Sequence, residues 1–341
     1  MTITLAILGA DVSSLQHAEN LGAKYYDEKG AQGDSLKILK DHGVNYIRLR
    51  VWVNPANGYN SKDKVVQFAS RVKARGMKLL IDFHYSDTWA DPDHQTKPTA
   101  WAGHSFSQLQ TDVYDHTYEV CSSLKSQGTM PDMVQIGNEI NPGMLWPDGH
   151  TSNWGNLAAL LKQGYDAVKA CSPLTQVMLH IANAGDGAGA REWFDNAMSR
   201  GVQWEVTGLS YYSYWHGPMS AMANTIKELK SRYGAPVVIV ETAYPFTLSE
   251  NDDEENVINS SGQLTSGYPA TPQGQAGNFK DVLSAARAGG AIGVFYWEPT
   301  WTAVRGNNWD PTNPSSGDQW ENQALFDYSS KALPALSEFR P

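Results

Sequence analysis

The sequence contains little cysteine, and its cysteines do not form a metal-binding pattern. Cys121 and Cys171 are the two cysteines among 341 residues. Their separation does not match the close spacing of metal-binding cysteines, which excludes a cysteine-based metal site. The two residues form either one disulfide or two buried thiols, and we favour thiols.

Basic charge and long apolar stretches are also scarce. Lys and Arg number 26 against 36 Asp and Glu, which gives a net charge of −10. This balance argues against a nucleic-acid partner, because phosphate binding needs a basic surface. No apolar run approaches the roughly 18 residues that a membrane span requires, so we expect no membrane segment. Neither a G-x-S-x-G nor an H-E-x-x-H motif occurs, which leaves serine-hydrolase and zinc-protease functions without support.

What the sequence does have is a regular alternation of strand-like and helix-like segments. Apolar, strand-like runs occur at 3–11, 45–52, 77–85, 133–139, 176–183, 206–213, 236–242 and 292–298. Amphipathic segments such as 33–43, 64–76 and 279–290 separate them. Strands that alternate with helices predict a parallel sheet, and this number of units predicts a (β/α)8 TIM barrel. We expect one catalytic barrel domain over residues 1–341, with an open doubly wound sheet as the alternative.

Polar side chains gather at the carboxyl ends of the predicted strands. They are Asp11, Arg48, Arg50, Asp82, His84, Asn138, Glu139, Tyr211, Tyr212, His216, Glu241, Trp297 and Glu298. A parallel strand that is buried on both faces should be apolar throughout, so charged groups there must be paired or used. We expect them to surround one pocket, bordered by the long segments 86–108 and 244–275, which follow strand ends on the same face.

Two carboxylates stand out among these residues. Glu139 and Glu241 each follow an apolar run directly, so we expect both to be fixed on rigid strand ends and to face each other. Glycoside hydrolysis requires such a pair. One carboxyl must stay protonated through a raised pKa, while an arginine such as Arg48 or Arg50 keeps the other ionised. The alternative for either glutamate is a buried ion pair or a strand-end cap.

Longer segments resemble one known family. They are "GADVSSLQHAENLGAKYYDEKG" (9–30), "YIRLRVWVNPANGYN" (46–60), "DFHYSDTWADPDHQTKP" (82–98), "IGNEINPGMLWPDG" (136–149), "LSYYSYWHG" (209–217) and "WENQALFDY" (320–328). Together they resemble the endo-β-1,4-galactanases, glycoside hydrolase family fifty-three. The resemblance implies a retaining, endo-acting enzyme that cleaves β-1,4-galactosidic bonds in galactan or type I arabinogalactan. It implies no cofactor for catalysis.

The resemblance also assigns roles to individual residues. Glu139 takes the acid/base role and Glu241 the nucleophile role, with their carboxyl groups about 5–5.5 Å apart. Asn138 hydrogen-bonds the sugar 2-hydroxyl, Tyr212 rather than Tyr211 donates to the nucleophile, and Trp297 is the platform under the reacting sugar.

Further substrate contacts are expected from Arg48, Asp82, His84, Trp89 and His216. Trp89 would stack on a sugar further along the chain. For Asp82 and His84 an alternative is open, in which they satisfy Arg48 or Arg50 within a buried network. The first strand starts too close to residue 1 for a signal peptide, so the chain is either cytoplasmic or a mature or trimmed form. Given the resemblance, we expect a secreted monomer.

A further prediction concerns the acidic segment 247–262. Glu250, Asp252, Glu254 and Asn256 lie two residues apart, and alternating oxygen ligands are typical of loops that bind calcium. The resemblance adds Asp318 and Glu321 to this structural calcium site, although Glu254 stands where the resemblance leads us to expect histidine. The alternative is a solvated acidic loop without metal.

Two other functions remain open at this point. Another β-glycanase, such as a mannanase or a cellulase, would use the same glutamates on the same barrel. A sugar-binding protein would keep the cleft and lose turnover.

Overall fold

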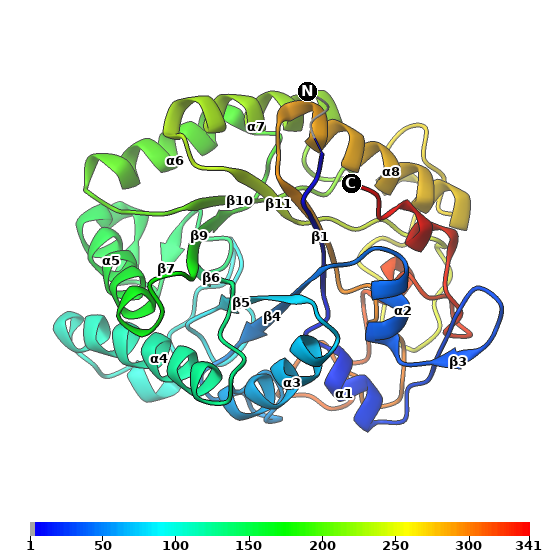
Figure 1. Ribbon diagram of the computed structural model, residues 1–341, viewed down its shortest axis with the longest axis horizontal. Coiled ribbons are helices and arrows are strands. Elements are labelled where there is room, and N and C mark those ends of the chain that lie inside the picture. The colour runs from blue at the N-terminus through cyan, green and yellow to red at the C-terminus, as the bar shows by residue number, and fades with distance from the viewer. Residues whose placement is uncertain (1–3) are drawn as a thin grey trace.

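Eight parallel strands close into a barrel in the computed structural model, which describes residues 4–341 (Figure 1). In order around the barrel these strands are β1 (Ile7–Asp11), β4 (Tyr46–Val51), β5 (Lys78–Phe83), β6 (Met133–Ile136), β9 (Gln176–Ile181), β10 (Val206–Ser210), β11 (Val237–Glu241) and β12 (Gly293–Trp297). Strand β1 pairs with both β4 and β12, which closes the ring. The predicted barrel is therefore confirmed, and the open-sheet alternative is wrong.

Helices surround the barrel on the outside, as Figure 1 shows. They are α1 (Leu15–Asn20), α2 (Ser35–Asp41), α3 (Lys62–Ala74), α4 (Phe106–Ser126), α5 (Trp154–Cys171), α6 (Gly187–Ser199), α7 (Met219–Tyr233) and α8 (Pro272–Gly289). Short hairpin strands lie outside the barrel: β2 (Tyr25–Tyr26), β3 (Gln32–Gly33), β7 (Gly143–Met144) and β8 (Gly149–His150). Single turns of 3-10 helix occur at Thr99–Trp101, Thr151–Asn153, Ser261–Gln263, Glu321–Gln323 and Pro334–Glu338.

Helix α8 illustrates how local sequence sets an element's start. It begins at Pro272, seven residues before the predicted segment 279–290. The Thr271 side chain accepts a hydrogen bond from the Gly274 N–H, and proline suits the first helical position because it has no N–H to satisfy. In the part of the chain that the structure describes, no helix has the length and apolar character needed to cross a membrane.

The two cysteines are both buried and free, in line with the preference for thiols. Cys121 lies in α4 and Cys171 at the end of α5. Helices α4 and α5 pack against each other.

One strand is shorter than predicted, and the difference falls on a key residue. Strand β6 ends at Ile136 instead of continuing to 139. Gly137 has φ 83° and Glu139 has φ 49°, so the backbone leaves the extended conformation directly after the strand. Glu139 is therefore held on a turn beyond the strand, and the expectation that it sits on a rigid strand end is wrong. At the other end of the sequence, Ile3 of the predicted first strand lies outside the described residues.

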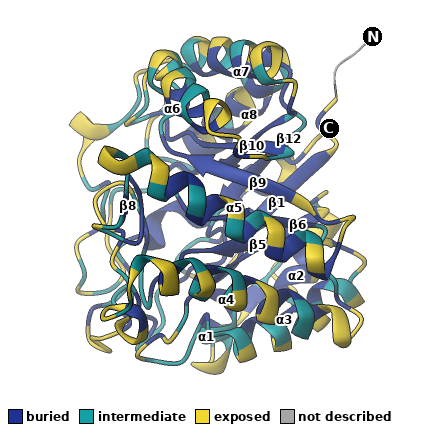
Figure 2. Ribbon diagram, turned by 90° about the vertical axis from the view of Figure 1, so that its left-hand side faces the viewer, coloured by how far each residue is buried: buried dark blue, intermediate teal, exposed yellow. Residues whose placement is uncertain are grey.

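The barrel interior is filled in layers, because alternate residues of each strand point inward. The lowest layer is apolar and consists of Ile7, Tyr46, Leu80, Met133, Met178, Val206, Val238, Val240 and Phe295. A larger apolar core lies between the strands and the helices. In Figure 2 the central strands are mostly buried, whereas the outer helices alternate buried and exposed residues. The inward positions above the apolar layer are polar, and they form the base of the site.

An irregularity in β11 decides where Glu241 points. Ile239 pairs with Leu209 and Glu241 pairs with Ser210, so Val240 is an extra residue opposite a shift in register. Val238 and Val240 both pack inside the barrel. Strict alternation would turn Glu241 outward after Val240, and a β-bulge is the usual device that re-aims one side chain. The bulge therefore brings Glu241 into the barrel.

Candidate active site

A cavity of about 650 Å³ opens at the carboxyl ends of the strands. The predicted site residues Asp82, His84, Trp89, Asn138, Glu139, Tyr212, His216, Glu241 and Trp297 all line it. The long segment after β5 contributes residues 88–94 and Thr96 to the wall. The segment after β11 contributes Val257, and the segment after β12 contributes Trp301, Trp309 and Trp320. The cavity therefore lies at the face of the barrel where the sequence predicted binding.

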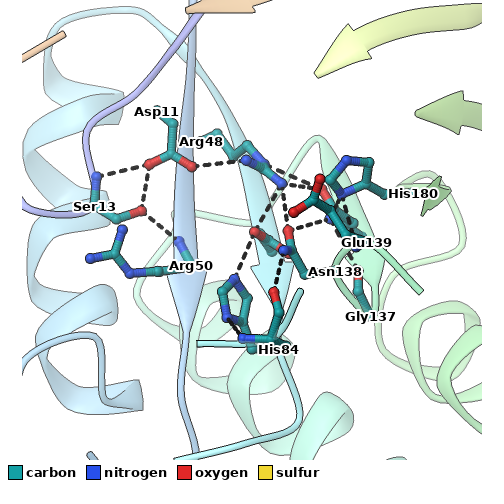
Figure 3. Close-up of polar contacts among 12 residues, drawn as sticks. Asp11, Ser13, Arg48, Arg50, His84, Gly137, Asn138, Glu139 and His180 are labelled. Carbon is teal, nitrogen blue, oxygen red and sulfur yellow. Dashed lines mark hydrogen bonds and ion pairs between the residues drawn. The ribbon is translucent and has the colours of Figure 1, made fainter. Parts of the chain in front are cut away.

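Arg48 lies beneath the cavity floor and is fully buried. Its Nη1 donates to Asp11 Oδ2 at 3.1 Å and to Glu241 Oε2 at 2.9 Å. Its Nη2 pairs with Asp82 Oδ2 at 3.0 Å and donates to Asn138 Oδ1 at 2.9 Å. Figure 3 shows the Arg48 guanidinium between Asp11 and Asn138. Buried charges are tolerated when they are paired and hydrogen-bonded, and here one cation serves three carboxylates.

Gln135 completes this group, which we call the Arg48 cluster: Arg48, Asp11, Asp82, Gln135, Asn138 and Glu241. The Gln135 Oε1 accepts from Arg48 Nε at 3.2 Å, and its Nε2 donates to Asn138 Oδ1 at 3.1 Å. Asn138 donates in turn to the Ala90 carbonyl at 2.7 Å. The floor of the cavity is therefore fixed by hydrogen bonds from several strands.

The buried Glu241 carboxyl accepts hydrogen bonds at both of its oxygens. The Tyr212 hydroxyl donates to Glu241 Oε1 at 2.8 Å, and Arg48 donates to the other oxygen. Burial raises the pKa of Glu241 above its usual value, and the Arg48 charge and the Tyr212 hydrogen bond oppose this rise. Tyr211, the alternative donor, instead donates to the Gly217 carbonyl at 2.7 Å. Two direct donors therefore favour the carboxylate form of Glu241.

Glu139 has a contrasting environment. It is partly exposed to the cavity, and its backbone N–H donates to His180 Nδ1 at 3.3 Å. Burial and the nearby Glu241 charge raise the pKa of Glu139 well above its usual value, against a weaker lowering by the Ser210 hydroxyl. Its left-handed backbone conformation is uncommon for a residue with a side chain, and such conformations cluster at functional sites. The pKa values of both carboxyls are raised, and that of Glu139 is raised further.

Asp82 and His84 are engaged with the protein. Asp82 Oδ2 contacts His84 Nε2 at 3.2 Å as well as Arg48. The His84 Nδ1 accepts from the Trp52 indole N–H at 3.0 Å and from the Ala90 N–H at 3.1 Å. Both ring nitrogens are thus occupied, as in the buried-network alternative, and a bond from His84 to a sugar hydroxyl would break one of these contacts. The Asp82 Oδ1 is buried without a partner.

Aromatic rings form the remaining walls. Trp89 is held by its indole N–H on the Trp309 carbonyl at 2.6 Å and by the Arg50 guanidinium, 4.1 Å from its ring centroid. Arg50 is itself paired with the fully buried Glu298 at 2.9 Å. Trp297 lies edge-on to Trp320 with ring centroids 4.9 Å apart. These contacts fix rings that a sugar face can stack against.

His216 lies on the same rim. Its Nδ1 accepts from the Tyr212 N–H at 3.0 Å. Burial lowers the pKa of His216 to about 4, so the ring is neutral at physiological pH.

Three polar residues in this region were missed at the sequence level: Gln135, His180 and Ser210, each fully buried. The signal was present in the strand period. Gln135 follows inward-facing Met133 by two residues, and His180 follows inward-facing Met178 in the same way. A polar residue in phase with interior apolar residues predicts a buried hydrogen-bonded group.

Some residues of the predicted calcium site contact one another. Asp252 Oδ2 accepts from the Asp318 N–H at 2.8 Å, and Glu321 Oε1 accepts from the Asp252 N–H at 3.4 Å. Glu254 accepts from the Trp309 indole, and Glu250 from the Asn256 N–H. We call Glu250, Asp252, Glu254, Asn256, Asp318 and Glu321 the acidic cluster. Over residues 4–341, no three His, Cys, Asp or Glu side chains are already arranged as a metal site.

A closed barrel of this kind, with two differently tuned carboxylates in one cavity, is typical of the barrel glycoside hydrolases. The resemblance is chemical as well as architectural, because such enzymes need one carboxyl protonated and one ionised at the carboxyl ends of the strands.

Comparison with known proteins identifies the family. The chain belongs to glycosyl hydrolase family 53, whose family model matches residues 7–339. It is 36% identical to the endo-beta-1,4-galactanase of Bacillus subtilis (strain 168), over 98% of this chain and 85% of that protein. It is 37% identical to the arabinogalactan endo-beta-1,4-galactanase of Cellvibrio japonicus (strain Ueda107), over 98% and 90% of the two chains. The solved GH53 catalytic domain of Ignisphaera aggregans has a TM-score of 0.94 at 41% identity, over 98% and 95%.

Proposed function

We propose that this protein is an endo-acting glycoside hydrolase that cleaves β-1,4-galactosidic bonds in galactan and type I arabinogalactan with retention of configuration. The observation that carries the proposal is the unequal pair in one cavity. Glu241 receives hydrogen bonds from Arg48 and Tyr212, whereas burial and the Glu241 charge raise the pKa of Glu139 well above its usual value. The galactanase names of the relatives supply the substrate class.

In the proposed reaction Glu241 is the nucleophile and Glu139 the acid/base. The Glu241 carboxylate attacks the anomeric carbon while Glu139 gives its proton to the leaving sugar oxygen. A covalent galactosyl-enzyme forms, and Glu139 then takes a proton from the water that releases the product. Once Glu241 is esterified its charge is gone, so the main charge that raises the pKa of Glu139 disappears when Glu139 must act as a base.

The remaining cavity residues hold the sugar in this proposal. Asn138 gives one amide hydrogen to Ala90, which leaves a second for the sugar 2-hydroxyl. Trp297 lies under the reacting sugar, Trp89 stacks on a more distant one, and His216 and Asp82 contact hydroxyls. Arg48 acts from below by holding Glu241 and Asn138 in place.

We also propose that residues 1–341 act as one catalytic domain, that the protein is a monomer that works outside the cell on plant polysaccharide, and that catalysis needs no cofactor. The clearest test measures reducing-sugar release from galactan, mannan and cellulose by the wild type and by Glu139→Ala. Release from galactan alone, abolished in the variant, supports the proposal. Release from mannan or cellulose instead would assign a different β-glycanase, and binding without release would assign a sugar-binding protein. Proton NMR of the first product formed distinguishes retention from inversion.

A structural calcium ion at the acidic cluster is part of the same proposal. The donor chemistry fits, because residues of these two segments have buried oxygens without hydrogen-bond partners: Asn256 Oδ1, Asp318 Oδ2, Glu321 Oε2 and Asn322 Oδ1. Calcium binds six to eight oxygens, so carboxylates and amides of this kind would hold it. The ion would supply charge compensation for Asp252, Asp318 and Glu321, and it would join the segment after β11 to the segment after β12. Chelation followed by a thermal melt tests the site.

A further inference from the structure

A buried glutamine joins the segment after β5 to the turn that carries Glu139. Gln95 is 1% exposed, and its Nε2 donates to the Asn138 carbonyl at 2.9 Å and to the Asp91 carbonyl at 3.1 Å. A longer contact, at 3.4 Å, reaches the Glu139 carbonyl. All three acceptors are carbonyl oxygens, which identifies this end of the side chain as the amide nitrogen. The predicted site residues do not include Gln95.

The main chain on both sides of Gln95 is held in place, so the side chain acts from a fixed base. The Gln95 carbonyl accepts from the Trp146 N–H at 2.9 Å, and Thr96 forms a bridge with Trp146. On the other side, Asp91 and His94 exchange backbone hydrogen bonds at 2.8 and 3.1 Å. The segment after β5 is therefore tied to the segment after β6 through the main chain as well as through this amide.

The peptide between Asn138 and Glu139 is held at both ends. Its oxygen accepts from Gln95 at 2.9 Å, and its N–H, which belongs to Glu139, donates to His180 Nδ1 at 3.3 Å (Figure 3). The contact with Gln95 is the shorter of the two, and 3.3 Å lies slightly beyond the usual range for an N–H donor. The orientation of this peptide therefore depends mainly on Gln95.

That orientation imposes an uncommon backbone conformation on Glu139, whose φ is 49°. Reversing a peptide changes ψ of the residue before it and φ of the residue after it, as the difference between type I and type II turns shows. Reversal of the peptide between Asn138 and Glu139 would bring φ of Glu139 to a negative value, which residues with side chains prefer. A left-handed residue of this kind persists only where its surroundings hold it. The amide of Gln95 supplies that restraint.

We infer that Gln95 is a positioning residue for Glu139: it holds the peptide before Glu139 and thereby fixes this carboxyl relative to the leaving sugar oxygen. The inference rests on the proposed acid/base role of Glu139. Proton transfer requires the acid within hydrogen-bond reach of the oxygen that it protonates. A displacement of about 1 Å can cost about 10²-fold in rate, so a loosened turn should slow this transfer.

The other polar groups of the cavity floor have anchors of their own. Asn138 Oδ1 and Glu241 Oε2 both accept from Arg48 at 2.9 Å. These bonds do not involve Gln95 and remain when it is replaced. Loss of the Gln95 amide should therefore affect proton transfer by Glu139 and leave the attack by Glu241 intact.

The test is Gln95→Met, which keeps the length of the side chain and removes its donor. The variant is assayed on phenyl and on 2,4-dinitrophenyl β-galactobioside, whose leaving groups are similar in size. Phenol needs a proton from Glu139 to leave, whereas dinitrophenol leaves without one, and kcat/KM reports the steps up to the galactosyl-enzyme. We expect kcat/KM to fall about 10–100-fold on the phenyl substrate and to stay within about twofold on the dinitrophenyl substrate.

Gln275→Met is the matched control. Gln275 is also fully buried, and its Nε2 also joins two segments by donating to backbone carbonyls, those of Tyr244 at 2.9 Å and Ala324 at 2.8 Å. Neither carbonyl belongs to the turn that carries Glu139. This variant should change kcat/KM on the two substrates by the same factor.

A second variant keeps the inference falsifiable if Gln95→Met does not fold. Gln95→Asn retains an amide whose reach is one carbon shorter, so the same selective loss on the phenyl substrate is expected. Equal losses on the two substrates would mean that Gln95 supports the fold or Glu241 in general, and unchanged values would mean that Glu139 does not depend on it; either result overturns the inference.

Failure of the inference and failure of the proposed function give different results. A wild type that cleaves galactan, with variants that show no selective loss, overturns the inference and leaves the proposed function intact. A wild type inactive on galactan and on both galactobiosides removes the proposed function itself.

Discussion

Two groups of carboxylates in this protein differ in how their negative charge is compensated. In the Arg48 cluster, three carboxylates share one guanidinium that the chain itself supplies. In the acidic cluster, burial and the Asp252 charge raise the pKa values of Asp318 and Glu321, and oxygens of Asp318 and Glu321 lack partners. The first region contains its compensating cation, whereas we propose that the second takes one from solution.

The difference matters because the two regions have different tasks. A nucleophile must stay ionised and fixed in direction, and a rigid fork of donors from a buried arginine does both. A loop that borders a binding cleft needs only to be held closed, and an exchangeable ion is sufficient for that. Four predictions test this comparison, from the largest expected effect to the smallest.

The largest effect should come from Glu241→Gln. The variant keeps the shape and most hydrogen bonds of the side chain but removes the nucleophilic charge, so kcat on galactan should fall by about 10³-fold or more. Glu321→Gln is the matched control in the acidic cluster and should keep kcat within about twofold at a temperature well below its melting point. Comparable losses in the two variants would contradict the division of tasks.

Arg48→Met tests the contribution of the buried Arg48 guanidinium. It leaves Asp11, Asp82 and Glu241 buried without a counter-charge, and we expect a loss of about 3–5 kcal/mol in the free energy of unfolding by urea titration. The control is Arg232→Met, since Arg232 pairs with Asp195 on the exposed surface at 2.8 Å, where solvent screens the pair and its loss should change the free energy of unfolding little. Equal costs for the two variants would rule out a special role for the buried guanidinium.

Calcium removal tests the structural ion that we propose at the acidic cluster. Adding a chelator at pH 8 should lower the melting temperature by about 5 °C, and excess calcium should restore it. The double variant Asp318→Asn with Glu321→Gln should melt at one temperature under both conditions. A wild type that does not respond to the chelator would favour the solvated-loop alternative.

The smallest effect is a pH dependence without calcium. Burial and the Asp252 charge raise the pKa of Glu321 to about 7, above the value of an unfolded chain. Between about pH 4.5 and 7 the folded state therefore binds more protons, so its stability falls as pH rises through this window. In chelator, the melting temperature should drop by about 1–3 °C from pH 5 to pH 7.5. Calcium should reverse the drop at the higher pH, and Glu321→Gln should reduce it.

Much of the fold followed from the period of the sequence. The eight apolar runs and the helical segments between them were sufficient to predict the barrel, and residues at strand ends predicted the cavity. Pattern alone did not place Glu139, because Gly137 and a left-handed turn carry the chain past the strand end. Nor could it show that both ring nitrogens of His84 are occupied, since Trp52 and Ala90 reach it from other segments.

Gln135, His180 and Ser210 were missed for a related reason. Each is a single polar residue within an apolar strand, and its meaning depends on which neighbour reaches it across the barrel. Strand order and register supply that information. Cross-barrel contacts of this kind are not visible in one strand's sequence.

The extra residue at Val240 also has a consequence for redesign. Someone who grafted this catalytic pair onto an idealised barrel with perfectly regular strands would carry over the right amino acids and the wrong orientation. The seventh strand would then present its glutamate to the surrounding helices, and the arginine below would lose one of its three carboxylate partners. In this scaffold the position of the proposed nucleophile depends on one extra backbone residue as much as on the identity of the side chain.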